Sequence, residues 1–361
     1  MQYKIVSADS HVTEAADLWV NYIDPQYKSR APHVERQEKT DAFVCEGATL
    51  LPVGLIAGAT RKDSEVRREG RWEEDVPPGG YDPHVRLKDM AQDGVDAEVV
   101  YPTIAMRMFM LQDLGFQQAC FRAYNSWIAD YCNAHPQQLK AISIISLEDI
   151  EAAVGELHRT RKLGHAGAMI ALFPDNAKPY HDPSYDPFWA AAEQLGMPVS
   201  LHVATERRPN PNKNIVDVTL LNVFSVQRVI LGMVYAGAFD KFPKLQVLSA
   251  ENDAGWAGNT IERADWFYTR NHRLRGHEMP CKRIPSEYFH NNVRYTFMRD
   301  LSAMAIRNIV GVENIMWSSD YPHHASTWPH SQEVIAQHSK GMPEADKRKI
   351  FCDNAVNLYG F

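Results

Sequence analysis

The stretch Ile315-Met316-Trp317-Ser318-Ser319-Asp320-Tyr321-Pro322-His323-His324 passes directly from an apolar run into a cluster of titratable side chains. A short apolar run of this kind is typical of a strand buried on both faces of a parallel sheet. Seven similar runs precede it, and residues 116–134, 148–163 and 187–195 between them have helical spacing. The eight runs are residues 5–8, 97–101, 141–145, 168–172, 199–203, 245–249, 294–297 and 315–319. Eight strands that alternate with helices predict an α/β fold, the (β/α)8 TIM barrel.

The chain is longer than such a barrel requires. It has 361 residues, whereas a (β/α)8 domain needs about 250. Most of the surplus lies in residues 13–83, which follow the first run and contain Pro, Gly and charge clusters with little periodicity. We expect residues 1–361 to form a single domain, with 13–83 as an insertion after strand 1 that lies over the barrel mouth. A loosely ordered surface excursion is the alternative for this segment.

The composition narrows the classes of partner. With 45 acidic and 38 basic side chains, the formal net charge is -7, which argues against binding to nucleic acid or to an anionic membrane. No apolar run approaches the roughly 20 residues of a membrane span, and the N-terminus does not have the pattern of a secretory signal. The five cysteines show no CxxC spacing. We therefore expect a cytoplasmic protein that acts on a small molecule.

Polar residues at strand ends predict a metal site, because a barrel of this type places its chemistry at the C-terminal ends of its strands. Asp9 and His11 end the first run, His202 lies near the end of the fifth, and Asp320 ends the eighth. Two residues apart on a strand, Asp9 and His11 point to the same face. Two imidazoles and two carboxylates suit zinc, manganese or iron(II). We therefore predict that these four residues bind a divalent metal.

Two more carboxylates and two more imidazoles lie near the same strand ends. Glu14 follows the first run and Glu251 ends the sixth, so both are further candidate ligands. His323 is a candidate catalytic group, and His324 a candidate substrate-binding group. Tyr101, after the second run, is a candidate for lining the pocket, with a plain position on the barrel rim as the alternative.

Two arginines are candidates for binding a substrate carboxylate. Arg207 follows the fifth run, and Arg299 follows the seventh. The planar guanidinium group binds carboxylates through two parallel hydrogen bonds. A solvated surface position is the alternative for the Arg207-Arg208 pair.

Several of these motifs together resemble a known family. Asp9-x-His11, His202, the stretch from Ser319 to His323, and the closing Asn354-Ala355-Val356-Asn357-Leu358-Tyr359-Gly360 are similar to the amidohydrolase superfamily. The resemblance is to its amidohydrolase-related branch, amidohydrolase 2, with aminocarboxymuconate semialdehyde decarboxylase and the resorcylate-type decarboxylases. It implies a distorted (β/α)8 barrel with one or two divalent metals, Asp320 as ligand or general base, and a homodimer or higher homo-oligomer.

Two positions depart from the pattern of that superfamily. Asp9 stands where the first His of a His-x-His pair is usual, and Glu251 stands where a His commonly polarises the substrate or binds a second metal. An ionised carboxylate cannot donate a hydrogen bond as that His does. The identity and the number of the metals are therefore open.

Three functions follow from these residues. The first is metal-assisted hydrolysis or non-oxidative decarboxylation of a small carboxylated or cyclic substrate, with Asp320, Glu251 and His323 as catalytic groups. The alternative is a dinuclear non-haem iron monooxygenase, in which Glu14, Glu251 and His323 join the other ligands around two irons. A non-enzymatic barrel is the third.

Overall fold

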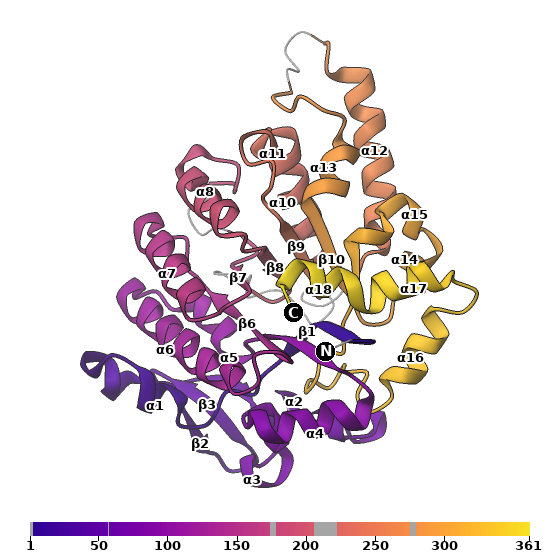
Figure 1. The fold of residues 1–361 in the computed structure, drawn as a ribbon. Helices are drawn as coiled ribbons and strands as arrows, with labels where there is room; N and C mark the ends of the chain where they lie inside the picture. Colours follow the sequence, from indigo (N-terminus) through magenta and orange to yellow (C-terminus); the bar gives the residue numbers. More distant parts are fainter. Residues whose placement is uncertain (1–2, 57, 174–177, 206–221, 275–278) are drawn as a thin grey trace.

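The structure, a computed structural model, describes residues 3–56, 58–173, 178–205, 222–274 and 279–361 (Figure 1). Eight parallel strands form one sheet in the order β1-β5-β6-β7-β8-β9-β10-β11. Their bounds are β1 (Val6–His11), β5 (Ala97–Tyr101), β6 (Leu139–Ile144), β7 (Gly167–Ile170), β8 (Val199–His202), β9 (Val247–Ala250), β10 (Val293–Phe297) and β11 (Ile315–Trp317). Each run expected from the sequence overlaps one of these strands, which confirms the (β/α)8 barrel.

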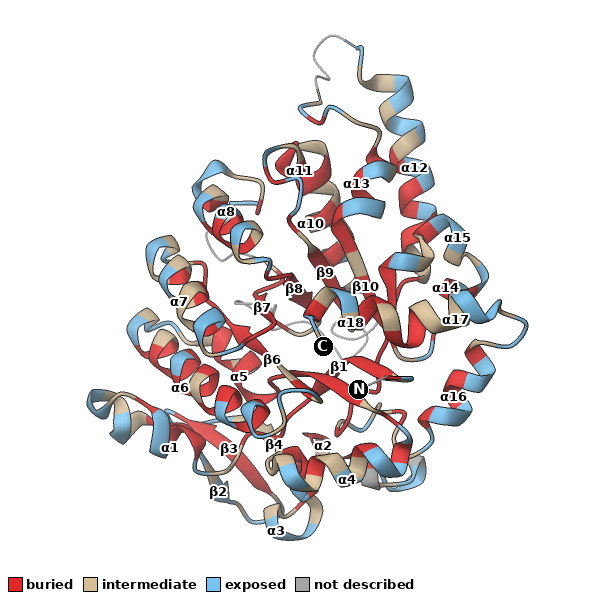
Figure 2. Cartoon of the chain, in the orientation of Figure 1, coloured by how far each residue is buried: buried red, intermediate tan, exposed pale blue. Residues whose placement is uncertain are grey.

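Helices surround the strands and turn their buried side toward them (Figure 2). The longer ones are α4 (Pro83–Asp93), α6 (Leu114–Asn133), α7 (Ile150–Lys162), α8 (Asp186–Leu195), α10 (Asn222–Tyr235), α12 (Gly255–Asn271), α13 (Pro285–Asn292) and α16 (Ser331–His338). The short ones are α1 (Leu18–Tyr22), α2 (Val53–Ile56), α3 (Trp72–Asp75), α5 (Ile104–Arg107), α11 (Ala238–Lys241), α14 (Leu301–Ala305), α15 (Arg307–Val310), α17 (Glu344–Arg348) and α18 (Asn354–Tyr359). Among the described residues, no helix combines the length and the apolar character that a membrane crossing requires.

Local sequence explains where these helices begin and end. The Asp149 carboxylate accepts the Ala152 N–H at 3.0 Å and caps the start of α7, as an acidic N-cap does for the otherwise unpaired N–H groups. Gly196, at φ +61°, ends α8 in the left-handed conformation that glycine adopts without strain.

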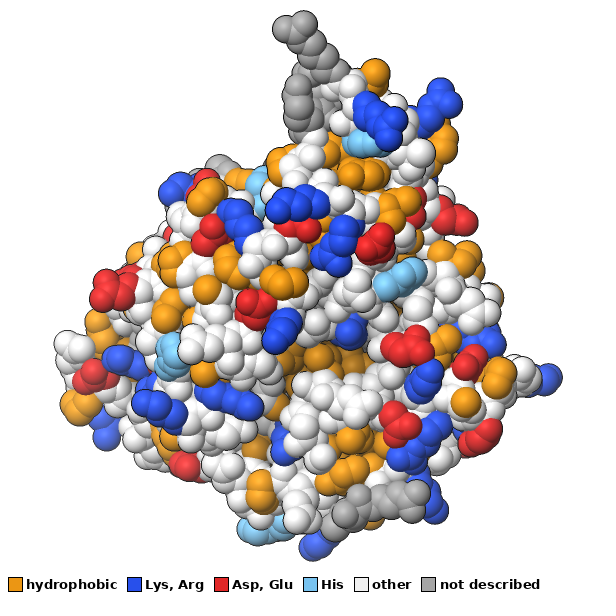
Figure 3. Space-filling model, turned by 45° about the horizontal axis from the view of Figure 1, so that its top comes forward, with side chains coloured by type: hydrophobic (Ala, Val, Ile, Leu, Met, Phe, Trp, Pro, Cys, Tyr) orange, Lys and Arg blue, Asp and Glu red, His pale blue; other side chains and the backbone are white. Residues whose placement is uncertain are grey.

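On the face in Figure 3, basic and acidic side chains are interspersed, so one sign of charge does not dominate it.

The barrel closes between its first and last strands through the segment that follows β11. Asp320 donates its backbone N–H to the Asp9 carbonyl at 3.1 Å, and His11 donates to the Tyr321 carbonyl at 2.7 Å. We call this junction of β1 with residues 318–321 the seam. Hydrogen bonds of single residues replace a regular strand ladder here, so the barrel is distorted at the seam, as the resemblance implied.

The insertion after strand 1 contains a sheet of its own. Its three antiparallel strands, in spatial order, are β2 (His33–Arg36), β3 (Asp41–Cys45) and β4 (Ala48–Pro52). All five residues of β3 are buried, so this part of the segment packs against the rest of the chain. The sequence did not reveal these strands because β2 and β4 contain no fully buried residue, so they do not form a pair of apolar runs like those of the barrel. The segment contacts the loop after β11, since Ala59 donates its backbone N–H to the Pro322 carbonyl at 3.1 Å.

Candidate metal centre

Six titratable side chains converge at the C-terminal ends of four strands. They are Asp9 and His11 on β1, His202 at the end of β8, Glu251 after β9, and Asp320 and His323 after β11. Asp9, His11, His202 and Asp320 are at most 1% exposed. The fold therefore brings together the residues that the strand-end argument singled out from distant parts of the chain.

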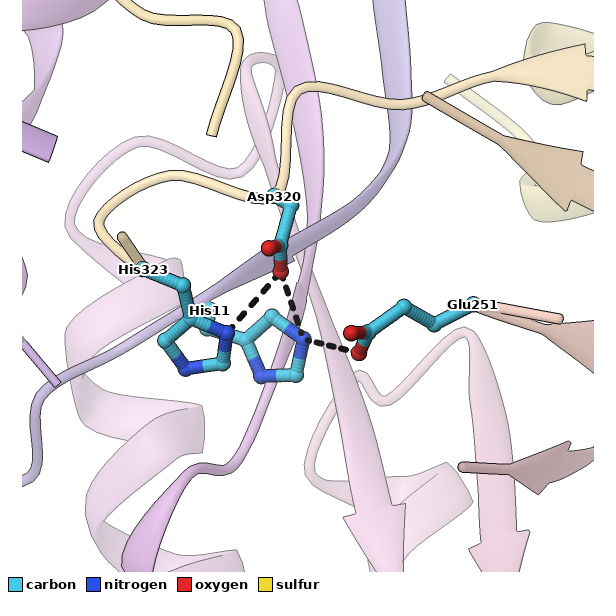
Figure 4. A group of neighbouring side chains, drawn as sticks. All are labelled: His11, Glu251, Asp320 and His323. Atoms are coloured by element: carbon cyan, nitrogen blue, oxygen red, sulfur yellow. Dashed lines mark ion pairs between the residues drawn. The ribbon is translucent and has the colours of Figure 1, made fainter. Parts of the chain in front are cut away.

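His11 lies at the middle of this cluster. Its Nε2 atom is 3.5 Å from Asp9 Oδ1, 3.4 Å from Asp320 Oδ1 and 3.8 Å from Glu251 Oε2 (Figure 4). His202 approaches from β8, with its Nε2 atom 3.7 Å from Asp9 Oδ1 and 3.4 Å from Glu251 Oε2. Two imidazole nitrogens and three carboxylates thus face a common point.

The potential ligand atoms form two overlapping groups. Within each group they lie within 4.8 Å of one another: His11, Glu251, Asp320 and His323 in one, and Asp9, His11 and His202 in the other. Because His11 belongs to both, the groups are adjacent, and the donor set fits either one ion or a pair.

Several atoms of the centre are buried without a hydrogen bond among the described residues. These are Asp9 Oδ1, His11 Nε2, His202 Nε2 and both carboxylate oxygens of Asp320. Leaving a buried polar atom unpaired costs about 1–3 kcal/mol, so five of them at one point require a compensating partner. Mixed nitrogen and carboxylate donors are the ligands of zinc, manganese and iron(II). The residues present therefore fit a divalent metal.

The two buried imidazoles have the orientation of metal ligands. His11 Nδ1 lies 2.7 Å from the Pro102 carbonyl, and His202 Nδ1 lies 2.9 Å from the Val203 carbonyl. A carbonyl only accepts, so in each ring Nδ1 carries a hydrogen and Nε2 is the nitrogen that faces the centre. A backbone carbonyl behind the ring is the usual support of a metal-binding histidine.

Burial and the charges of neighbouring groups shift the pKa values of the ionisable side chains at the centre. Burial and the neighbouring imidazoles hold the pKa of His11 well below its usual value, and burial with the Asp9 carboxylate raises the pKa of Asp320 well above its own. Burial and Asp320 raise the pKa of Glu251 to about 8. Burial acts to lower the pKa of His202, but Asp9 and Glu251 outweigh it and raise that pKa to about 9. Without a cation the centre retains protons that a bound metal would displace.

His323 lies beside this cluster on the loop after β11. Its ring stacks on His11 with 4.1 Å between centroids, its Nδ1 atom is 2.9 Å from Asp320 Oδ1, and its Nε2 atom is 2.9 Å from Thr103 Oγ1. Figure 4 shows the Asp320 carboxylate facing both rings, with a dashed line to His323 and another to His11. This places His323 where it can exchange a proton with Asp320.

The backbone at the mouth is strained. Ala204, Glu251, Asp253 and Asp320 are non-glycine residues at φ values from +53° to +61°, just after β8, β9 and β11. Such conformations cost about 1–3 kcal/mol each and occur where function requires them. The strain therefore marks the same end of the barrel as the ligand cluster.

Glu14 and Tyr101 direct their polar atoms to groups outside the cluster, although the centroid of the Tyr101 ring lies 5.4 Å from that of the His202 ring. The Glu14 carboxylate accepts the backbone N–H groups of Thr103, Ile104 and Ala105 at 2.9–3.1 Å and so holds the start of α5. The Tyr101 hydroxyl points into the barrel interior, where it lies 2.7 Å from Ser200 Oγ. Both groups are occupied by structural contacts, because their polar atoms already have partners.

The other candidate substrate-binding residues lie in different settings. Arg299 is exposed and donates to the Ala325 carbonyl at 3.0 Å, whereas Arg207 lies outside the described residues. His324 packs against Gly58 of the insertion so closely that a Cβ atom at Gly58 would lie 2.4 Å from that of His324. His324 therefore joins the barrel mouth to the insertion.

Sequence reasoning missed the residues that support the ligands. Thr296 on β10 donates from Oγ1 to Asp9 Oδ2 at 3.1 Å. Arg86 on α4 pairs with Glu98 on β5 at 2.6 Å and donates to the His11 carbonyl at 2.7 Å. The only signal was a charged residue, Glu98, inside an apolar strand. Its partner is remote in sequence, so no local pattern identified the pair.

A family model described as amidohydrolase matches residues 16–361. The gamma-resorcylate decarboxylase of Rhizobium sp. is 28% identical over 263 residues, which cover 66% of this chain and 75% of the relative.

Two solved structures share the fold. An amidohydrolase from Mycobacterium avium subsp. paratuberculosis superposes with a TM-score of 0.79 at 20% identity, with 100% of both chains covered. The 5-carboxyvanillate decarboxylase of Novosphingobium aromaticivorans, solved with manganese and 4-hydroxy-3-methoxy-5-nitrobenzoic acid, has a TM-score of 0.70 at 20% identity, covering 99% of this chain and 96% of that one. At this identity the likeness shows the fold alone. None of these names points to an oxygenase, so the diiron alternative gains no support.

Proposed function

The chain belongs to the amidohydrolase family, and we propose that it is a divalent-metal-dependent decarboxylase of a small aromatic or otherwise unsaturated carboxylic acid. The observation that carries this proposal is the buried Asp320 carboxyl group, whose Oδ1 atom lies 3.4 Å from His11 Nε2 and 2.9 Å from His323 Nδ1. A carboxyl in this setting retains a proton, and decarboxylation needs one for the carbon that loses CO2. The name of the Rhizobium relative supports the same reaction.

Asp9, His11 and His202 are the proposed metal ligands, since their ligand atoms lie within 4.8 Å of one another, and Asp320 beside them is left free to transfer a proton. The three supply two imidazoles and one carboxylate, with Glu251 on the side nearest to solvent, where its side chain is 22% exposed. Manganese, zinc and iron(II) all accept this donor set. When bound, such an ion polarises a substrate carboxylate and an adjacent oxygen as a Lewis acid.

Asp320 and His323 are the proposed proton-transfer pair. The carboxyl group of Asp320 would donate a proton to the ring or alkene carbon, and a π electron pair of the substrate would form the new C–H bond. The bond between that carbon and the carboxylate would then break, CO2 would leave, and the electron pair of the broken bond would restore the double bond. His323, with Nδ1 2.9 Å from Asp320 Oδ1, would take up a proton from solvent and pass it to the ionised carboxylate, which restores the acid. General acid catalysis of this kind contributes about 10²–10⁴-fold to a rate.

Glu251 is the proposed contact for the substrate's polar substituent. Its carboxyl group has a raised pKa of about 8, and protonated it donates a hydrogen bond as an ionised carboxylate cannot. This would restore the donor that a histidine supplies at the corresponding strand end in the superfamily.

Arg107, at the end of α5, is the proposed contact for a second anionic group of the substrate. Its helix follows β5 at the same end of the barrel as the cluster, and its side chain is partly buried, which lowers its pKa. A buried guanidinium without a counter-ion is unfavourable and binds a carboxylate well. We expect Arg107→Met to raise KM about 10–100-fold with a smaller change in kcat, since a hydrogen bond to a charged group contributes about 1.5–3 kcal/mol.

Steady-state kinetics with the saturating metal test this role. The matched control is Arg122→Met on α6, where the side chain is 57% exposed, and it should leave KM unchanged. An unchanged KM in Arg107→Met would remove Arg107 from the substrate site.

The insertion is the proposed cover of the barrel mouth. The contacts of Gly58 with His324 and of Ala59 with Pro322 support this role. A cover there would shape the pocket and exclude water from the carbon that accepts the proton.

Metal analysis and a substrate panel test the proposed function. We expect the purified protein to carry a divalent metal and to release CO2 from a hydroxybenzoic or related acid, with loss of activity in EDTA and recovery on addition of Mn2+. Ester, lactone and amide substrates form the second panel. Hydrolysis without CO2 release would contradict decarboxylation and favour a hydrolase, and O2 consumption would favour the oxidative alternative.

A further inference from the structure

Thr296 on β10 connects two parts of the centre through one hydroxyl group. Its Oγ1 atom donates to Asp9 Oδ2 at 3.1 Å and accepts the backbone N–H of Glu251 at 2.9 Å. The side chain is fully buried. A threonine hydroxyl has a single proton to donate, so this proton is committed to Asp9.

This contact decides which oxygen of Asp9 is available. Oδ2 is satisfied by Thr296, whereas Oδ1 is unpartnered among the described residues and lies 3.5 Å from His11 Nε2 and 3.7 Å from His202 Nε2. Thr296 thereby directs one oxygen of Asp9 toward the two imidazole nitrogens. It also holds the N–H of Glu251, whose φ is +53°.

Thr103, after β5, has an analogous role on the other side of the centre. Its Oγ1 atom lies 2.6 Å from the Val12 carbonyl and 2.9 Å from His323 Nε2. A carbonyl cannot donate, so the hydroxyl proton goes to Val12 and the hydroxyl oxygen accepts from His323 Nε2. The His323 ring is thus held with Nδ1 directed at Asp320 Oδ1, 2.9 Å away.

We propose that Thr296 and Thr103 are positioning residues with separate tasks: Thr296 directs Asp9 for metal retention, and Thr103 directs His323 for proton transfer with Asp320. The inference rests on the proposed function and deepens it. Neither threonine belongs to the strand-end motifs identified in the sequence, and each acts through another residue. Loss of a supporting hydrogen bond behind a metal ligand typically weakens metal binding about 10–100-fold.

The test compares isosteric and conservative variants. Thr296→Val and Thr103→Val remove the hydroxyl at nearly constant volume, and Thr296→Ser and Thr103→Ser retain it. The matched control is Thr160→Val on α7, a buried threonine whose Oγ1 donates to the Leu157 carbonyl at 3.1 Å. Mn2+ affinity is measured by chelator competition, kcat and KM at saturating Mn2+, and folding by circular dichroism and Tm.

The expected result is a crossed pattern. Thr296→Val weakens Mn2+ binding about 10–100-fold, and saturating Mn2+ restores most of its kcat. Thr103→Val leaves Mn2+ affinity within about twofold and lowers kcat about tenfold or more at unchanged KM, because only the proton-transfer geometry is lost. The serine variants return both quantities to those of the unmodified protein, and Thr160→Val changes neither.

Several outcomes would overturn the inference. They are unchanged Mn2+ affinity in Thr296→Val, unchanged kcat in Thr103→Val, or equal losses of both quantities in both variants. If Thr103→Val does not fold, Thr103→Ala provides the same comparison. Failure of the proposed function can be told apart from failure of this inference, because the unmodified protein would then bind Mn2+ without releasing CO2. In that case the role of Thr103 in proton transfer would be wrong as well. The role of Thr296 would still be decided by Mn2+ affinity alone.

Discussion

The seam of the barrel and the wall formed by β6 and β7 join their strands in different ways. On the wall, a parallel ladder in regular register pairs Ile142 with Gly167 and Ile144 with Met169. At the seam, hydroxyl groups add to the backbone hydrogen bonds, with Ser10 Oγ 2.9 Å from Ser319 Oγ and Ser7 Oγ accepting the backbone N–H of Ser319 at 2.9 Å. The ladder consists of backbone hydrogen bonds and does not depend on which side chains the strands carry, whereas the seam depends on hydrogen bonds of particular side chains. The comparison shows that side-chain hydrogen bonds help to join the strands next to the metal centre.

An ion pair beneath the centre connects this polar network. Arg86 bonds to Glu98 and to the His11 carbonyl, and its guanidinium lies 4.5 Å from the centroid of the Tyr321 ring. Ser10 donates to the other oxygen of Glu98 at 3.1 Å. A buried pair such as this one is strongly destabilising when one member is removed.

Asp320→Asn provides the largest test of the contrast between seam and wall. The amide cannot donate a proton to carbon as an acid does, so we expect kcat to fall about 10²–10⁴-fold. The wall counterpart is Ser143→Ala, which removes a hydroxyl that donates to the Gly167 carbonyl at 3.2 Å. Decarboxylation assays at saturating Mn2+ measure both variants. The kcat of Ser143→Ala should stay within about twofold of that of the unmodified enzyme, since Ser143 touches no reacting atom. If Asp320→Asn kept more than about a tenth of the unmodified kcat, Asp320 would not be the proton donor.

Arg86→Met tests stability at the seam. It leaves the Glu98 carboxylate, which is 2% exposed, without its counter-charge. We expect a loss of about 3–5 kcal/mol in the free energy of unfolding. Ile144→Val on the wall should cost about 0.5–1.5 kcal/mol. Urea unfolding of the metal-free protein compares the two variants. Equal losses in the free energy of unfolding would mean that the ion pair at the seam stabilises the protein no more than apolar packing on the wall does.

The pH dependence of metal affinity is the smallest expected effect. The carboxylates of Asp9 and Glu251 raise the pKa of His202 to about 9, so below that pH the imidazole carries a proton that the metal must displace. Affinity should therefore increase with pH up to about 9, by about tenfold per pH unit for each proton released. Chelator competition at pH 6.5, 7.5 and 8.5 measures it, and an affinity independent of pH would exclude His202 as a ligand.

Local patterns in the sequence were sufficient to identify the barrel strands and the centre. Each strand is buried on both faces and therefore appears as an apolar run, and Asp9, His202 and Asp320 stand out because they interrupt such runs at one end. The same reasoning selected Glu14 and Tyr101, since it detects position along the chain but not which partner a side chain meets. Glu14 binds backbone amides and Tyr101 binds Ser200.

The sequence by itself determined the (β/α)8 architecture and the strand ends at which chemistry is placed, because hydrophobic periodicity and polar interruptions are local properties of the chain. Tertiary structure alone decided that Arg86 meets Glu98, that Thr296 meets Asp9, and that Thr103 meets His323. These contacts join residues that are between 12 and 287 positions apart. Their geometry depends on how the closed barrel and its insertion pack, and a hydrogen bond depends on distances and angles that no sequence pattern encodes.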